Sequence, residues 1–246
     1  MPNTRGRFIT FEGIECAGKG TQIALAIDYL KTHHVKIMGY HEPGGTPYGE
    51  ALRMLLKHPQ KAMMALFNEF KDHSDFPDIK ILLDKALKNE LNIFRVPQCE
   101  LFMFEAVRAE FSKLMRGLLD TGINIISDRF ADSTTAYQGY GHGLNLRYVE
   151  EMNRIAVAGL WPDLTFFLDI TIEEMIKRVA LQSKEKNAFF EQHCNQEFFE
   201  RVRHGYLEIA KAEPTRFLVI NGDQPKEQVF EKISPHLDWL FGIKQT

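Results

Sequence analysis

The sequence predicts an α/β protein, a three-layer α/β/α sandwich in which helices cover both faces of a parallel sheet. Two observations lead to this fold class. Short apolar runs typical of buried strands alternate with longer segments of helical periodicity along the whole chain. The composition, 44% hydrophobic and 26% charged residues, is that of a globular protein that can build a core. Parallel strands need crossover connections, which are usually helices.

Five segments have the strand pattern. They span residues 8–11, 35–40, 124–127, 164–169 and 216–220. Six segments have the helical pattern: about 19–32, 48–57, 98–119, a helix opening at Thr171, 198–212 and 226–240. Pro97 suits the start of the third helix, and Thr171 with Glu174 has the spacing of a capping box. In such a sheet, ligands bind at the carboxyl ends of the strands, so the segments that follow each strand are the places to search.

The stretch from His58 to Val96 does not fit the alternation. It contains no convincing strand, yet it is too apolar for a linker, and it suggests two short amphipathic helices around the turn at residues 75–78. Packing or an oligomer contact is the simplest role for it. The expectation is a single domain, 1–246, with a helical insertion at approximately 58–96.

Composition excludes several classes of protein. Lys and Arg number 30 against 33 Asp and Glu, a formal net charge of −3, which argues against a dedicated nucleic-acid binder. The three cysteines lie far apart and form no zinc-binding spacing. No apolar run approaches the roughly 20 residues needed to span a bilayer. We therefore expect a cytoplasmic protein that contacts neither nucleic acid nor membrane.

A glycine-rich loop follows the first strand. Residues 13–19, Gly-Ile-Glu-Cys-Ala-Gly-Lys, match the phosphate-binding loop pattern G-x-x-x-x-G-K. Glycines let backbone N–H groups surround phosphate oxygens, and the helix that follows directs its positive end at the same point. Lys19 can reach the outer phosphates as a mobile charge. The next position is Gly20 instead of a hydroxyl residue, so Thr21 is the candidate substitute as a magnesium ligand.

Other polar residues lie at the ends of strands or on one helix face. Glu42 opens a Pro-Gly-Gly turn after the second strand, where an ordinary turn is the simpler interpretation. Asp128 ends the third strand and can hold Mg²⁺, and Arg129 offers a planar fork for phosphate oxygens. Phe104 and Arg108 share a helix face and suit a stacked base, although a core Phe beside a surface Arg fits the spacing better. The polar stretch 133–143 is either a loop with helix caps or the floor of a nucleotide site.

Together these motifs resemble those of thymidylate kinase. The segments that carry the resemblance are Phe11-Glu-Gly-Ile-Glu-Cys-Ala-Gly-Lys-Gly-Thr21, Glu42-Pro-Gly-Gly-Thr46, Leu101-Phe-Met-Phe-Glu-Ala-Val-Arg108, Asp128-Arg-Phe130, Ala136-Tyr-Gln-Gly-Tyr-Gly141 and Pro162-Asp-Leu-Thr165. They are similar to the bacterial type, within the P-loop nucleoside monophosphate kinases. The resemblance implies a P-loop NTPase fold with a five-stranded parallel sheet, a homodimer, and Mg²⁺-dependent transfer of the γ-phosphoryl group of ATP to dTMP. The products would be dTDP and ADP, in dTTP biosynthesis.

The resemblance also assigns roles to residues. The ATP site would comprise Gly13, Ile14, Glu15, Cys16, Ala17, Gly18, Lys19, Gly20 and Thr21, with Lys184 and Lys186. The dTMP site would comprise Glu42, Arg53, Phe104, Arg108, Arg129, Thr134, Tyr137 and Gln138. Phe104 matches the residue that stacks on thymine, and Arg108 the one that bonds its carbonyl edge. The catalytic set would be Lys19, Asp128, Arg129 and Glu15, and the metal ligands Asp128 and Thr21.

The chain departs from the family pattern at the cationic lid. Some members have an arginine where this loop has Cys16, and others supply arginines from a lid, here approximately residues 182–196, which contains none. Lysine lacks the fork geometry of arginine. Either Lys184 or Lys186 substitutes, or Arg178 reaches in, or turnover is slow; the lysines are the working hypothesis.

Two alternatives stay open at this stage. The acceptor could be dUMP or another nucleoside monophosphate, because one methyl group is worth only about 1–3 kcal/mol. The chain could also be a nucleotide-binding protein without kinase turnover, a reading that the lid and Gly20 favour. The residues that match an acceptor site, Glu42, Arg108, Asp128 and Arg129, count against it.

Overall fold

The structure, a computed structural model, describes residues 5–57, 96–181 and 196–244, together with single positions at 64, 65, 68, 69, 78, 81 and 85. Within these residues, five parallel strands form one sheet in the order β2-β3-β1-β4-β5. The strands are β1 (Phe8–Glu12), β2 (Ile37–His41), β3 (Asn124–Asp128), β4 (Leu164–Asp169) and β5 (Phe217–Asn221). This confirms the predicted α/β fold, and each strand begins and ends within two residues of its predicted bounds.

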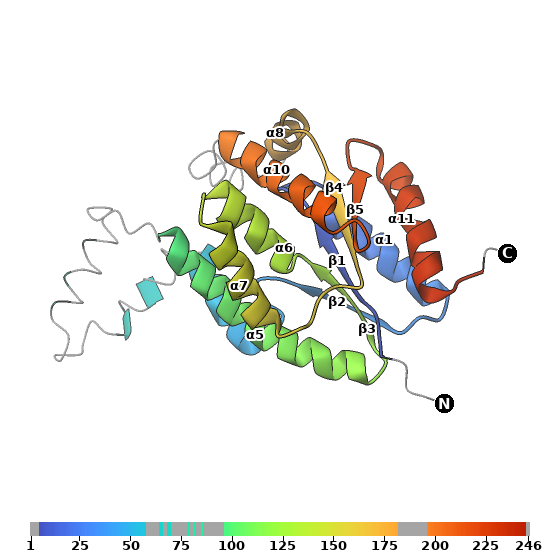
Figure 1. Ribbon diagram of the computed structural model, residues 1–246, viewed down its shortest axis with the longest axis horizontal. Helices are drawn as coiled ribbons and strands as arrows, with labels where there is room; N and C mark the ends of the chain where they lie inside the picture. Colours follow the sequence, from blue (N-terminus) through green and yellow to red (C-terminus); the bar gives the residue numbers. More distant parts are fainter. Residues whose placement is uncertain are drawn as a thin grey trace.

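The sheet is buried because helices cover both of its faces (Figure 1). Helices α1 (Lys19–Thr32) and α11 (Lys226–Phe241) pack together on one face. The other face carries α5 (Pro97–Asp120), α7 (Leu146–Val157) and α10 (Gln196–Ala212), while α2 (Pro47–Lys57) packs beside α5. Burial from both sides explains why the central strands read as continuous apolar runs. All five residues of β1 are buried.

Strand register brings the predicted site residues to one edge. Phe11 of β1 pairs with Asp128 of β3 on one side and with Phe166 of β4 on the other. His41 of β2 pairs with Asp128, so Glu42 follows at the same level. The carboxyl ends of β1, β2 and β3 therefore meet beside the start of α1, where the glycine-rich loop lies.

Helix ends agree with the sequence signals. Pro97 is the first residue of α5. The capping box at the start of α8 (Ile172–Ala180) is confirmed, because the Thr171 side chain accepts a hydrogen bond from the backbone N–H of Glu174 at 3.2 Å. Helices expected between residues 58 and 96, and the lid at approximately 182–196, fall almost entirely outside the described residues.

The segment after β3 differs from the loop that its composition suggests. It forms α6 (Ala131–Thr134) and then a π-helix, η1 (Thr135–Gly141). The glycines of η1 serve close packing and not a turn. A Cβ on Gly141 would lie 2.8 Å from the Phe198 ring on α10, so only glycine lets the two helices approach this closely. Helix α7 was not predicted, although Asn145 is a typical N-cap residue and the buried positions of the helix recur at helical spacing.

No helix among the described residues is both long and apolar enough to cross a bilayer.

Candidate active site

The glycine-rich loop between β1 and α1 has the backbone of a phosphate-binding nest. Gly13, Cys16 and Gly18 have positive φ angles of 148°, 59° and 92°. At Gly13 a Cβ would lie 2.8 Å from the main-chain oxygen of Leu168, so the neighbouring strand leaves no room for a side chain. Such turns direct backbone N–H groups inward, and the start of α1 adds its positive end. The loop therefore has a backbone that suits an anion.

Lys19 lies over this loop. Its Nζ donates to the main-chain oxygens of Gly13 at 3.1 Å and Ile14 at 3.2 Å. Burial, together with the nearby charge of Arg129, lowers the pKa of Lys19 to about 8. Carboxylates at Asp128 and Glu15 act in the opposite direction. An incoming phosphate would stabilise the charged amine at this position.

Arg129 connects the glycine-rich loop to the elements on the other face of the sheet. Its Nη2 donates to Glu15 Oε1 at 3.0 Å and to the Tyr137 hydroxyl at 3.1 Å. Its Nη1 donates to Ser133 Oγ at 3.2 Å and to the Tyr206 hydroxyl at 3.3 Å. Its guanidinium carbon lies 4.8 Å from the centre of the Tyr137 ring. Four partners from three segments fix the planar cation beside the loop.

Glu12, which sequence reasoning did not select, bonds two of the side chains that hold Arg129. Its Oε1 accepts from the backbone N–H of Phe130 at 2.7 Å, and its Oε2 accepts from the Ser133 and Tyr206 hydroxyls at 2.5 and 2.9 Å. Burial raises the pKa of Glu12 to about 7, and the charge of Asp132 adds to this shift. Tyr206 lies 194 residues away in sequence, so no local pattern could have joined them.

Asp128 ends β3 with one side-chain oxygen in an unusual state. Oδ1 is buried and has no hydrogen-bond partner among the described residues. A buried carboxylate oxygen without a partner costs free energy unless a cation or a donor completes it. Its charge reaches Lys19, as the pKa of that amine records. Asp128 therefore fits a Mg²⁺ ion shared with phosphate oxygens, which needs only one or two carboxylates from the protein. Thr21, the second predicted ligand, is exposed on the first turn of α1.

A second buried cluster surrounds Arg108 on α5. The guanidinium is held by Glu42 after β2, by Glu105 one turn earlier on α5, and by Asn153 on α7. Only 2% of the Arg108 residue surface is exposed. Burial raises the pKa of Glu42 to about 7, although Arg108 opposes the shift. The predicted base-reading arginine is thus a buried ion-pair centre.

The remaining predicted acceptor-site residues lie around these clusters. Thr134 and Gln138 are buried on α6 and η1, Phe104 is half-buried on α5, and Tyr137 donates to Glu15. Arg53 on α2 donates to the main-chain oxygen of Pro43. Lys184 and Lys186 lie outside the described residues.

Comparison with known proteins supplies the reaction. A family model described as thymidylate kinase matches residues 11–70 and 70–233. The thymidylate kinase of Kosmotoga olearia is 34% identical over 230 residues, 92% of each chain. That of Chlorobaculum parvum is 37% identical over 241 residues, 94% of this chain and 95% of the other. A crystal structure of thymidylate kinase from Ehrlichia chaffeensis superposes with a TM-score of 0.64 at 29% identity, covering 95% of this chain and 99% of that one.

The chain belongs to the thymidylate kinase family. Its activity is therefore that of a dTMP kinase, a phosphotransferase, which the resemblance of its motifs predicted. The non-catalytic alternative loses its support, since full-length relatives share the name of the enzyme.

Sequence reasoning missed three residues that complete the site of this thymidylate kinase family member. Glu12 and Tyr206 complete the Arg129 cluster, and Asn153 completes the Arg108 cluster. Glu105 also contacts Arg108, and its position three residues before that arginine is a local signal for an ion pair. Asn153 comes from α7, which was not predicted, and its contact with Arg108 spans 45 residues.

Proposed function

We propose that residues 13–21 and Lys19 hold the ATP phosphates, and that Arg129 binds the phosphate of dTMP. The observation that carries this proposal is the contact between Arg129 and Glu15 at 3.0 Å. Glu15 belongs to the glycine-rich loop, whereas Arg129 follows β3. Their ion pair therefore brings the loop proposed for the ATP phosphates next to the arginine proposed for the dTMP phosphate. The position of Glu15 between Arg129 and Lys19 suits a group near both phosphates.

The mechanism follows from the physics of phosphoryl transfer. Charge spreads over the equatorial oxygens of the transferred group, so catalysis consists mainly of positioning and cationic stabilisation. Lys19 and Arg129 supply two positive charges, and the backbone nest of the loop supplies N–H donors. Glu15 orients Arg129 directly. Glu12 acts indirectly, because it bonds the Ser133 and Tyr206 hydroxyls to which Arg129 donates.

Mg²⁺ is proposed as the cofactor, held by Asp128, with Thr21, the first hydroxyl residue after Lys19 in the sequence, as the second ligand. Bound there, the ion would neutralise developing charge on the phosphates. The support is the buried, unpartnered Oδ1 of Asp128. The ion would also remove the free-energy cost of burying that oxygen without a partner.

The base is proposed to bind between Phe104 and the Arg108 cluster. Arg108 lies one helical turn after Phe104, and Thr134 and Gln138 are buried on α6 and η1, which both contact α5. This arrangement suits a pyrimidine, and dTMP is the acceptor that the family implies. A preference over dUMP rests on the methyl group alone.

A coupled assay of ADP release with dTMP, dUMP, dGMP and dCMP tests the acceptor. We expect dTMP to give the highest kcat/KM, dUMP to follow, and the purine to be inactive. A purine acceptor that outperformed dTMP would overturn the base-site proposal. If ATP bound but no acceptor were used, the assignment of Arg129 to the acceptor phosphate would fail too.

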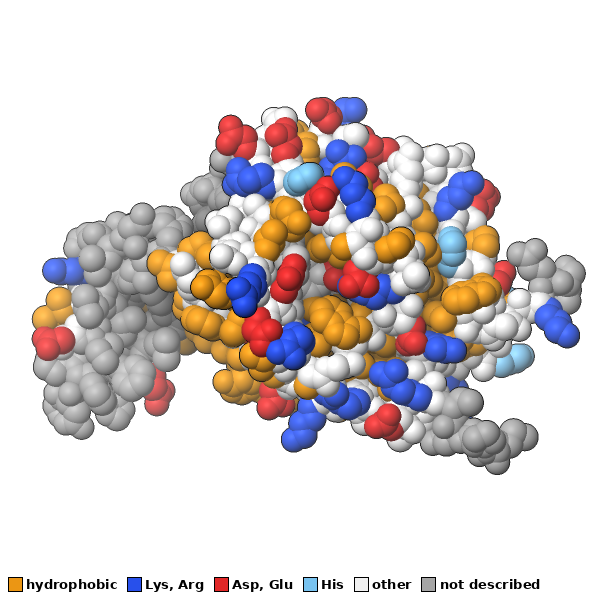
Figure 2. Space-filling model, viewed as in Figure 1, with side chains coloured by type: hydrophobic (Ala, Val, Ile, Leu, Met, Phe, Trp, Pro, Cys, Tyr) orange, Lys and Arg blue, Asp and Glu red, His pale blue; other side chains and the backbone are white. Residues whose placement is uncertain are grey.

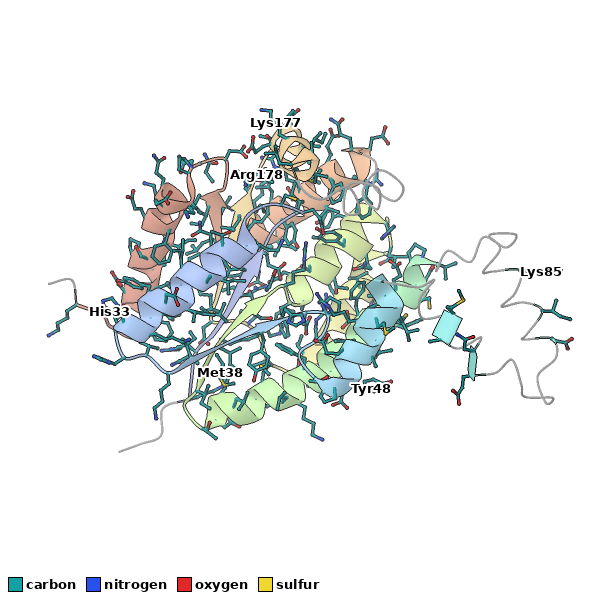
Figure 3. All side chains as sticks on the ribbon, turned by 180° about the vertical axis from the view of Figure 1, so that it is seen from behind. His33, Met38, Tyr48, Lys85, Lys177 and Arg178 are labelled. Atoms are coloured by element: carbon teal, nitrogen blue, oxygen red, sulfur yellow. The ribbon has the colours of Figure 1, made fainter. Side chains whose placement is uncertain are left out.

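A homodimer is proposed through the face formed by α2 and α5. Tyr48 and Phe102 are 58% exposed there, and with Leu52 and Met103 they line a shallow apolar pocket. Figure 2 shows apolar side chains gathered over the amino-terminal part of α5. Figure 3 shows Tyr48 at the edge of α2. Contiguous exposed apolar surface of this kind marks a protein–protein contact.

A further inference from the structure

The Arg108 cluster contains more carboxylate than the cation needs. Glu42 and Glu105 both contact one guanidinium, with N···O distances of 3.0 and 2.8 Å. The second oxygen of each carboxylate, Glu42 Oε1 and Glu105 Oε2, is buried and has no hydrogen-bond partner among the described residues. A single carboxylate would balance the charge of Arg108. The presence of Glu105 therefore calls for a role other than neutralisation.

The five N–H groups of Arg108 are not equally occupied. Nε donates to Glu42 Oε2 at 3.0 Å. Both hydrogens of Nη1 are used, one by Glu105 Oε1 at 2.8 Å and one by Asn153 Oδ1 at 3.0 Å. Nη2 shares Glu42 Oε2 at 3.0 Å and has only a long contact, 3.4 Å, to the main-chain oxygen of Phe130. The bond to Phe130 is the longest that the guanidinium makes, so the second hydrogen of Nη2 is the donor that a ligand displaces most easily.

Glu105 determines that Nη2, and not Nη1, is the nitrogen available to a ligand. It lies on α5 three residues before Arg108 and fixes Nη1 from the same helix, while Asn153 fixes it from α7 and is itself held through Thr135 at 2.9 Å. Without Glu105, the unpartnered Oε1 of Glu42 becomes the strongest free acceptor near the guanidinium. The guanidinium would then turn so that Nε and Nη2 bond one Glu42 oxygen each, in place of sharing Oε2, because guanidinium and carboxylate favour the bidentate geometry. That turn moves Nη2 away from the position in which it can donate to a base.

We propose that Glu105 is a positioning residue for base selection, which holds Arg108 by Nη1 so that Nη2 donates to the 4-carbonyl of the acceptor pyrimidine. This inference rests on the proposed base site. A fixed donor bonds to the 4-carbonyl oxygen of thymine or uracil, which accepts, and cannot bond to the 4-amino group of cytosine, which is itself a donor. Glu105 thereby acts on the choice between carbonyl and amino bases and not on the methyl group.

Glu105→Ala tests the proposal through ratios of kcat/KM. We expect the dTMP-to-dCMP ratio to fall at least tenfold, mainly through a higher KM for dTMP, with kcat and the KM for ATP within twofold of the wild type. The dTMP-to-dUMP ratio should not change, because both bases have the 4-carbonyl. Glu105→Gln keeps an oxygen for Nη1 and should stay within threefold of the wild-type dTMP-to-dCMP ratio. Glu110→Gln, an exposed residue of the same helix, is the matched control.

Several results would overturn the proposal. These are an unchanged dTMP-to-dCMP ratio in Glu105→Ala, an equal loss with all three acceptors, and a Glu105→Gln variant as unselective as the alanine variant. If circular dichroism shows that Glu105→Ala is unfolded, Asn153→Ala removes the other acceptor of Nη1 and should lower the ratio at least threefold; no change there contradicts the proposal.

Arg108→Lys separates this inference from the base site itself. The lysine keeps the positive charge but has no Nη2 donor, so the dTMP-to-dCMP ratio should fall. If Arg108→Lys keeps the wild-type ratio, Arg108 does not read the base and the proposed base site is wrong. If Arg108→Lys loses selectivity while Glu105→Ala keeps it, only the role of Glu105 is wrong.

Discussion

Arg178 Nη1 donates to the main-chain oxygen of Cys16 at 3.2 Å, which ties α8 directly to the phosphate loop. Its Nη2 donates to the main-chain oxygen of Gly222 at 2.8 Å, and Glu174 orients the guanidinium from the preceding turn. One side chain therefore joins the loop after β1 to the loop after β5. Of the three explanations for the missing lid arginine, the described residues give Arg178 a contact with the loop.

Arg178→Ala should lower kcat/KM for ATP by about tenfold or more, because hydrogen bonds from a charged group are worth about 1.5–3 kcal/mol each. Steady-state kinetics with ATP varied measures this. Lys177→Ala is the control, since that neighbour is 74% exposed on the same helix and Arg178 only 27% (Figure 3). A normal rate in Arg178→Ala, with loss in a Lys184→Ala/Lys186→Ala double variant, would return the role to the lysines. Full turnover in the double variant would end the lysine hypothesis.

Lys19→Ala should abolish most turnover, and Lys19→Arg should change the pH dependence of ATP binding. Lys19 is charged below its pKa of about 8 and neutral above it. ATP favours the charged amine, so the Kd of the wild type should rise more than tenfold between about pH 8 and pH 10, by linkage. The Arg variant stays charged throughout. Calorimetric titration that gave parallel profiles for the two proteins would remove Lys19 from the phosphate site.

Asp128→Asn should raise the Mg²⁺ concentration needed for half-maximal rate and lower kcat by about 10²-fold or more, as for the loss of a group that stabilises transition-state charge. The amide is nearly the same size, so the fold should be kept. Magnesium titrations of the rate give the measurement, with Asp132→Asn unsuitable as a control because that carboxylate pairs with Arg216. Exposed Asp28→Asn serves instead. An unchanged Mg²⁺ requirement would place the ion elsewhere.

Glu12→Gln should alter the pH dependence of stability. The folded protein holds the Glu12 proton up to about pH 7, while the unfolded chain loses it near 4.5. The raised pKa therefore stabilises the protonated fold below about 4.5, and this contribution is lost as pH rises through about 7, by up to about 3 kcal/mol. Denaturant unfolding at pH 4.5 and 8 should show a smaller loss for Glu12→Gln than for the wild type. Glu110→Gln should follow the wild type. An identical loss of unfolding free energy between pH 4.5 and 8 in all three proteins would contradict the raised pKa of Glu12.

Phe102→Glu should convert a dimer into a monomer. The substitution places a charge at the centre of the α2 and α5 face, where Phe102 is 58% exposed. Light scattering after size exclusion measures the mass directly. Ile155→Glu, a change at a 62% exposed residue on α7, should leave the dimer intact. A wild-type protein that is monomeric at micromolar concentration would contradict the proposed interface.

The strands and most helices could be predicted because their signals are local. The β1 and β4 runs are mostly apolar since both faces of the sheet are covered, and Thr171 caps α8 through a neighbour three residues away. The π-helix η1 could not be predicted. Its Gly141 is needed for contact with Phe198, which lies far along the chain, and local composition makes the same residue look like part of a turn.

The site divides in the same way. Lys19 was predicted from the glycine-rich loop motif that contains it, whereas Asp128 ends β3 and Arg129 follows it, so the rule that ligands bind at the carboxyl edge found them. Glu12, Tyr206 and Asn153 act through partners far along the chain, with the Arg129 contact to Tyr206 spanning 77 residues. Buried polar partners of this kind are selected by three-dimensional satisfaction of donors and acceptors, which a linear pattern does not contain.

The π-helical turns of η1 make the length of this segment a functional quantity. Removing one residue between Thr135 and Gly141 would allow regular α-helical hydrogen bonds, which have better geometry than those of a π-helix. The same deletion would rotate the side chains on one side of it by about 100° relative to the other. Tyr137 would then leave Glu15 and Arg129. The chain keeps a less favourable backbone in η1, and this backbone holds the Tyr137 hydroxyl against Glu15 of the phosphate loop.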